Sequence, residues 1–142
     1  MKWDRQACER CRMVLSDRHY AAQVRVFPEG SRSRVLYFDD IGCASLWLVD
    51  KPWEQDPGTE IWVKDHGTGE WIDACSATYV QNKITPMEYG LGAQKGPVPG
   101  GMDFATARQH FARVEHRHNK RGEQLADWLK QQAAERKTAR QE

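Results

Sequence analysis

The feature of this sequence that most constrains its fold is a recurring order of two strand-length segments followed by a helical segment. In the first half, residues 22–27 alternate between apolar and polar side chains, and residues 34–38 are mostly β-branched, aromatic or aliphatic. Pro28-Glu29-Gly30-Ser31 lies between them, where Pro presets one turn torsion and Gly accepts a positive φ. These observations predict two antiparallel strands joined by a turn.

A helical segment follows the second strand. Asp39 or Asp40 can cap its N-terminus, because a short carboxylate accepts hydrogen bonds from the free backbone N–H groups of a first turn. Ile41 and Leu48 repeat at helical spacing, and Pro52 ends the segment. We attribute both aspartates to helix capping at this point.

The same order recurs in the second half. Residues 60–64 predict a short strand, residues 65–69 a hairpin turn with two glycines, and residues 71–80 a longer strand. A loop rich in Gly and Pro covers residues 85–101. Asp103 can cap a second helix, whose predicted apolar face consists of Phe104, Ala107, Phe111 and Val114.

The predicted fold is therefore α+β, with two small ββα-type lobes that resemble an internal duplication and pack together. The lobes cover about residues 8–52 and 58–114, within a domain of residues 1–114. Residues 115–142 are polar and predict a helical, partly disordered tail that Gly122 interrupts. Leu125, Trp128 and Leu129 give this tail one short apolar stripe.

Composition limits the classes of partner. The chain has 142 residues, 39% hydrophobic and 29% charged, with a formal net charge of +1, so it lacks the basic excess typical of nucleic-acid binding. No apolar run approaches the roughly 20 residues of a membrane span. Residues 1–8 lack the apolar region of a signal peptide. We expect a cytoplasmic protein, or a periplasmic one if a leader has been removed.

The segment Cys8-Glu9-Arg10-Cys11-Arg12-Met13 contains three sulfur side chains. A Cys-x-x-Cys pair can place both sulfurs on one metal ion, and thiolates and thioethers are soft ligands that suit Cu(I). The same pair can instead be a redox dithiol or half of a structural zinc site. Arg10 and Arg12 favour thiolates in either case. The segment therefore predicts a metal or thiol site.

Three more sulfur residues are candidates for this site. Cys43 lies on the first predicted helix and Cys75 on a predicted strand; each is either a small buried side chain or, with Cys8 and Cys11, part of a four-thiolate zinc site. Met87 lies in the Gly- and Pro-rich loop and is either an apolar plug or a partner of the N-terminal sulfurs. No Ser/His/Asp set, phosphate loop or spaced carboxylate pair indicates an enzyme.

Several motifs in a fixed order resemble the NosL family, over roughly residues 8–112. They are Cys8-x-x-Cys11-x-Met13, Tyr37-Phe38-Asp39-Asp40-Ile41-Gly42-Cys43, Trp71-Ile72-Asp73-Ala74, Tyr79-Val80 and Pro86-Met87-x-Tyr89-Gly90. Members of this family are nitrous oxide reductase accessory proteins that bind Cu(I).

The resemblance implies a two-lobed ββα-type fold and a non-enzymatic copper metallochaperone. The sulfur ligands of the family fall on Cys11, Met13 and Met87, and Cys8 and Cys43 are further candidates. The expected partner is a client metalloenzyme or a metal-site assembly factor. The alternatives are a structural zinc module that uses Cys8, Cys11, Cys43 and Cys75, and a Cys-x-x-Cys thiol protein.

Overall fold

The computed structural model describes the backbone of residues 1–141 and the side chains of residues 1–121 and 123–136. The chain divides into two compact units: Met1–Phe111 forms the first, and the second begins at Ala112. Within the described residues, no helix is both long and apolar enough to cross a membrane. The first unit contains both sheets and all the sulfur residues considered above.

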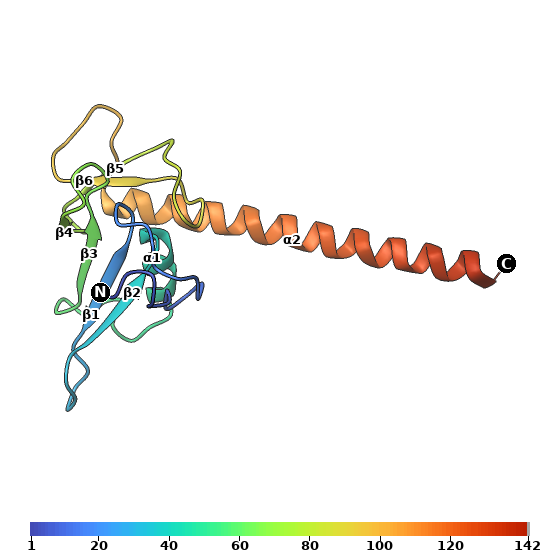
Figure 1. The fold of residues 1–142 in the computed structure, drawn as a ribbon, viewed down its shortest axis with the longest axis horizontal. Helices are drawn as coiled ribbons and strands as arrows, with labels where there is room; N and C mark the ends of the chain where they lie inside the picture. Colours follow the sequence, from blue (N-terminus) through green and yellow to red (C-terminus); the bar gives the residue numbers. More distant parts are fainter. Residues whose placement is uncertain (142) are drawn as a thin grey trace. The chain divides into compact units, whose positions relative to one another are not determined.

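Four antiparallel strands form the main sheet of the first unit (Figure 1). They are β1 (Ala22–Val26), β2 (Arg34–Phe38), β3 (Glu60–Lys64) and β4 (Trp71–Asp73), in the spatial order β2-β1-β3-β4. Val24 of β1 lies opposite Leu36 of β2 and Ile61 of β3. The side chains of β1 alternate between buried and more exposed positions, as a strand with one face on a core requires.

The helix α1 (Ile41–Leu48) packs against β1 and β2 and covers the buried face of the sheet at this end (Figure 1). Asp40 is its N-cap, and its side chain accepts a hydrogen bond from the backbone N–H of Gly42 at 3.0 Å. The helix buries six of its eight residues. It is therefore held mainly by packing, as a short helix with this little polar surface must be.

Two further strands, β5 (Thr78–Val80) and β6 (Gly92–Gln94), pair with each other in a small second sheet. Tyr79 of β5 is fully buried, and its hydroxyl donates to the carbonyl oxygen of Ala74 at 2.8 Å. β6 also contacts β3, where the isolated bridge between Asp65 and Ala93 joins the two sheets.

The helix α2 (Phe104–Gln141) begins in the first unit. Asp103 precedes it and accepts a hydrogen bond from the backbone N–H of Thr106 at 2.8 Å, as predicted for its cap. The predicted interruption at Gly122 is wrong, since the helix continues to Gln141. A single helical Gly costs only about 1 kcal/mol relative to Ala, and good helix formers surround this one.

The predicted α+β class is confirmed by the two antiparallel sheets and their helices. The predicted strand over residues 71–80 is wrong, because β4 ends at Asp73 and β5 begins at Thr78. The Asp73 carboxylate accepts a hydrogen bond from the backbone N–H of Cys75 at 2.9 Å and turns the chain there. β3 and β4 join the sheet of the first hairpin, so the two predicted halves share one sheet.

Candidate metal centre

The N-terminal sulfur segment folds into a tight loop. The backbone N–H of Cys8 donates to the carbonyl oxygen of Met13 at 2.8 Å, and that of Arg12 donates to Cys8 at 3.0 Å. Arg12 has a φ of 67°, a left-handed conformation that closes the loop. The N–H of Glu9 donates to the carbonyl oxygen of Tyr37 at 2.8 Å and fixes the loop beside β2.

This placement brings four potential metal ligands together, which we call the thiol–carboxylate cluster. One ligand atom each from Cys8, Cys11, Asp39 and Cys43 lies within 4.8 Å of all the others. Cys8 and Cys43 are fully buried, Asp39 is 3% exposed, and Cys11 is half-buried. The cluster therefore joins the N-terminal loop, the end of β2 and the first turn of α1.

Asp39 is a member of this cluster that the sequence analysis missed. Cys11 Sγ donates a hydrogen bond to Asp39 Oδ2 at 3.1 Å. The other carboxylate oxygen, Oδ1, is buried and has no hydrogen-bond partner. The attribution of both aspartates to capping is thus wrong for Asp39, because Asp40 alone caps α1 and leaves its neighbour beside the sulfurs.

The pKa values of the three thiols in the cluster are shifted in different directions. A hydrogen bond from Cys43 lowers the pKa of Cys8 to about 4, against the opposing effect of burial. Burial, together with the bond to Asp39 and the proximity of Cys8, raises the pKa of Cys11 to about 12. The hydrogen bond to Cys8 and burial also raise the pKa of Cys43. These pKa values favour the thiolate at Cys8, and a metal ion that uses all three sulfurs must displace the protons of Cys11 and Cys43.

The two predicted methionine ligands lie in loops next to the cluster. The carbonyl oxygen of Met13 accepts from Cys8, as described above, and its side chain is 51% exposed. Met87 is half-buried, and its backbone N–H donates to Asp40 Oδ2 at 3.4 Å. Ligation by the sulfur of either residue stays a prediction.

Tyr89 connects the Met87 loop to the N-terminal loop. Its hydroxyl accepts a hydrogen bond from Arg10 Nη1 at 3.1 Å. Its ring lies so close to Gly42 that a Cβ at that position would be 2.3 Å from a ring carbon. His110 and Phe111 of α2 also hold Tyr89, through a 2.8 Å contact to its carbonyl oxygen and an edge-on ring contact. Tyr89 therefore fixes one sulfur-bearing loop against the other.

Cys75 lies outside the cluster. It is exposed, in the turn between β4 and β5. The structure therefore does not assemble the predicted four-thiolate zinc site, because Cys75 is not among the ligand atoms that it brings together.

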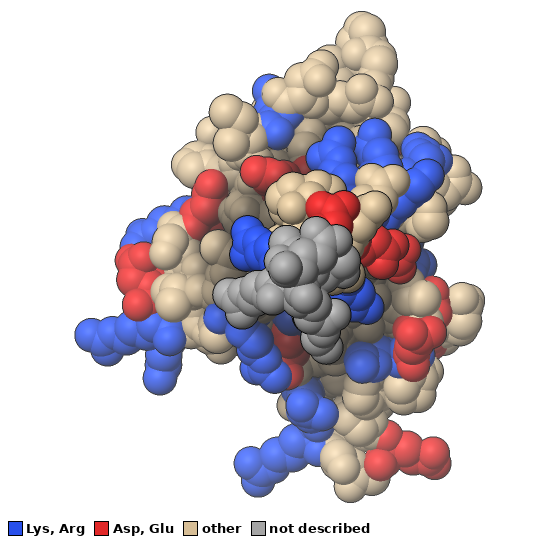
Figure 2. All heavy atoms as spheres, turned by 90° about the vertical axis from the view of Figure 1, so that its right-hand side faces the viewer, with Lys and Arg blue, Asp and Glu red and all other residues tan. Residues whose placement is uncertain are grey.

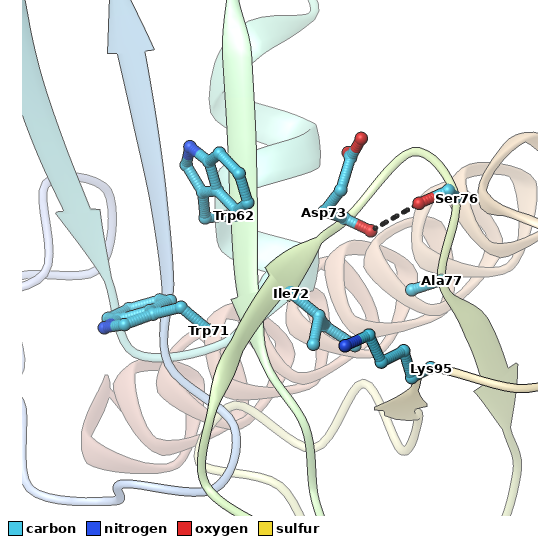
Figure 3. A pocket seen from close by; sticks show the side chains of 7 residues that line it. All are labelled: Trp62, Trp71, Ile72, Asp73, Ser76, Ala77 and Lys95. Atoms are coloured by element: carbon cyan, nitrogen blue, oxygen red, sulfur yellow. Dashed lines mark hydrogen bonds between the residues drawn. The ribbon is translucent and has the colours of Figure 1, made fainter.

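A separate cleft of about 230 Å³ lies beside β3 and β4 (Figure 3). Trp62 of β3 and Ile72 of β4 are among the side chains that line it, and the hydroxyl of Ser76 donates to the carbonyl oxygen of Asp73 at its edge. None of the cluster residues lines this cleft. On the face displayed in Figure 2, basic and acidic side chains are interspersed, as the net charge of +1 would suggest.

The chain was compared with protein families, curated proteins and solved structures. The family model described as NosL matches residues 3–136, nearly the whole chain. No curated protein and no solved structure matches the chain.

Proposed function

The chain belongs to the NosL family, a family of copper-associated accessory proteins, and we propose that it is a Cu(I)-binding metallochaperone. In this role it delivers copper to a client metalloenzyme or to the machinery that assembles the metal site of that enzyme. The role is non-catalytic: the chain holds the ion and passes it on.

The observation that carries this proposal is the position of Cys11, the half-buried thiol of the cluster, in the same tight loop as Met13. Thiolates are the protein ligands that Cu(I) prefers, and thioethers from methionine also suit it. We propose Cys11, Met13 and Met87 as the Cu(I) ligands, which we call the copper set. Cys8 and Cys43 lie beside Cys11 in the thiol–carboxylate cluster and are further candidate ligands.

The exposure of these residues supports exchange of the ion. Cys11 is the only thiol of the cluster that is not fully buried, and the Met13 side chain is 51% exposed. An ion held here is accessible to the ligands of a partner protein. Neutral thioether ligands also bind more weakly than thiolates and are the first that an incoming ligand can replace.

Two contacts made by the Met87 loop support the inclusion of Met87. Arg10, between the first two cysteines, donates to Tyr89, two residues after Met87. Asp40, next to a cluster residue, accepts from the backbone N–H of Met87. The first contact holds the Met87 loop beside the N-terminal loop, and the second holds it beside the start of α1.

A Cu(I) competition titration under anaerobic conditions tests this proposal. Met13→Leu and Met87→Leu keep the side-chain volume but remove the thioether, and we expect each to weaken Cu(I) binding at least about tenfold. Met102→Leu removes a half-buried methionine elsewhere in the first unit and should leave the affinity unchanged. Cys11→Ser should weaken binding further than either methionine variant.

Two results would overturn the proposal. Unchanged Cu(I) affinity in Cys11→Ser would remove the central ligand. Equal affinities of wild type, Met13→Leu and Met87→Leu would show that the thioethers take no part, and the copper set would then be wrong.

A further inference from the structure

The thiol–carboxylate cluster contains a carboxylate donor, Asp39, that Cu(I) does not require. We propose that Cys8, Cys11, Cys43 and Asp39 form a closed four-ligand site for a divalent ion of the zinc class, and that this site shares Cys11 with the copper set. Only the shared use of Cys11 rests on the proposed function; the site itself stands on the geometry of the cluster.

The spacing of the four ligand atoms fits a tetrahedral ion. Zinc–sulfur bonds of about 2.3 Å and zinc–oxygen bonds of about 2.0–2.2 Å place neighbouring ligand atoms of a tetrahedral site about 3.5–3.8 Å apart. The four atoms here lie within 4.8 Å of one another, and Cys11 Sγ is 3.1 Å from Asp39 Oδ2. Small side-chain rotations are therefore enough to bring all four atoms onto one ion.

Asp39 indicates which class of ion the site takes. Its Oδ1 atom is buried without a hydrogen-bond partner although Asp39 is only 3% exposed, and buried carboxylate oxygens ordinarily have a partner. A metal ion supplies that partner. Carboxylate oxygen is a harder donor than sulfur and is a regular ligand of Zn²⁺, whereas Cu(I) prefers soft sulfur.

Burial separates this site from the copper set. Cys8 and Cys43 are 0% exposed and Asp39 is 3% exposed, while Met13 is 51% exposed. Four protein ligands in a closed environment are typical of structural zinc sites, which leave no position for solvent or substrate. The buried site retains its ion, and the exposed copper set exchanges its ion.

The shared cysteine links the two sites. When Cys11 completes the four-ligand site, it is withdrawn from the copper set, so the divalent ion and Cu(I) compete for this one sulfur. Occupancy of the buried site by a divalent ion therefore lowers the apparent affinity of the chain for Cu(I).

Cobalt(II) is the probe for this site, because tetrahedral cobalt–thiolate centres absorb in the visible range. The full chain, reduced and freed of metal by chelation, is titrated anaerobically with Co²⁺. We expect one equivalent to give these bands and Zn²⁺ to remove them. Asp39→Asn keeps the shape of the side chain and should weaken Co²⁺ binding at least tenfold, and Cys43→Ser should abolish it.

Matched controls separate the site from other sulfur residues. Cys75→Ser removes the exposed thiol outside the cluster, and Met87→Leu removes only a copper ligand; both should bind Co²⁺ as wild type does. The thermal unfolding of each metal-free variant shows whether it is folded. Because Asp39→Asn is the least disruptive change, it keeps the test decisive even if Cys43→Ser does not fold.

The outcomes distinguish this inference from the proposed function. Wild-type Co²⁺ affinity in Asp39→Asn, or absence of the visible bands in the wild type, would overturn the divalent site. Addition of Cu(I) should remove the cobalt bands; if Cu(I) binds while they persist, the sharing of Cys11 is wrong. Loss of Cu(I) affinity in Met87→Leu with unchanged Co²⁺ affinity supports both sites. Equal Cu(I) affinities overturn only the copper set.

Discussion

Arg10 Nη1 donates a hydrogen bond to the hydroxyl of Tyr89 over 3.1 Å, between residues 79 positions apart in the chain. This contact connects the loop that contains Cys8 and Cys11 to the loop that contains Met87. The position of one proposed copper ligand relative to the others therefore depends on a bond between two residues that bind no metal themselves.

Tyr89→Phe tests this dependence. The variant removes only the hydroxyl, so we expect a loss of about 0.5–1.5 kcal/mol in the free energy of unfolding. Cu(I) affinity should fall about threefold to tenfold, which corresponds to about 0.7–1.4 kcal/mol, and Co²⁺ affinity should not change. Tyr37→Phe, which removes the hydroxyl of a half-buried tyrosine on β2, is the control. Unchanged Cu(I) affinity in Tyr89→Phe would show that the contact does not position Met87.

Gly42→Ala should disturb the same loop through the ring of Tyr89. A Cβ on this residue would be 2.3–2.4 Å from two carbons of the Tyr89 ring, too close for any real contact. Because Tyr89 is 2% exposed and has little room to move, we expect a loss of about 1–3 kcal/mol in stability, measured by urea unfolding. In Gly96→Ala the new methyl group meets nothing within 4 Å, so this variant should unfold as wild type does. Similar losses in both variants would contradict the packing argument.

Arg12 and Glu88 have left-handed backbone conformations, with φ of 67° and 60°. Each stands next to a methionine of the copper set, and such a conformation costs a residue with a side chain about 1–2 kcal/mol. Arg12→Gly and Glu88→Gly should each stabilise the metal-free protein by about 0.5–1 kcal/mol, after the greater entropy of an unfolded Gly is included. Gly30→Ala should destabilise the metal-free protein, because φ is 74° at this residue although the space around it is open. Thermal unfolding of the three variants measures these changes in stability. Destabilisation by both Arg12→Gly and Glu88→Gly would contradict the prediction.

Asp40 predicts a pH dependence for the metal-free protein. Burial raises its pKa from 3.8 to about 6, against the hydrogen bonds from Thr85, Gly42 and Met87. Between these two pH values the folded state binds a proton that the unfolded state has released. Asp40 therefore contributes at most about 3 kcal/mol to the free energy of unfolding. This contribution is complete below pH 3.8 and is lost as the pH rises through 6.

Asp40→Asn isolates this effect, because the amide oxygen can still accept from Gly42 but does not titrate. Unfolding free energies of wild type and variant should converge at low pH and separate in favour of the variant as the pH rises from 4 to 7. Groups with lowered pKa, such as Asp103, act in the opposite direction but are common to both proteins. A difference that does not change over this range would mean that Asp40 titrates normally.

The elements that follow from local pattern were predictable. Both hairpin strands of the first half, the start of α1 after the two aspartates and the start of α2 after Asp103 agree with the structure. In each case, the information lies within a few neighbouring residues, as alternation, helical spacing or a capping side chain. The cysteines of the N-terminal loop and Cys43 were likewise identifiable by residue type, and the structure brings all three together.

What depends on distant contacts was not predictable in the same way. The pairing of β1 with β3 joins strands from the two different predicted lobes, and no local sequence pattern specifies this pairing. The break after Asp73 was missed because an alternating segment reads as one strand even where a side chain turns the chain. For Asp39 a signal was present: one helix has one N-cap, so two consecutive aspartates leave one residue unexplained.

The order of the elements along the chain also bears on when each site can form during synthesis. The bond from Cys11 to Asp39 closes a separation of 28 residues, and α1 packs against β1 and β2, which precede it in the chain. The contact between Arg10 and Tyr89 closes 79 residues, at a greater cost in loop entropy. A chain emerging from the ribosome therefore has every ligand of the buried divalent site available well before Met87, and the copper set is completed last.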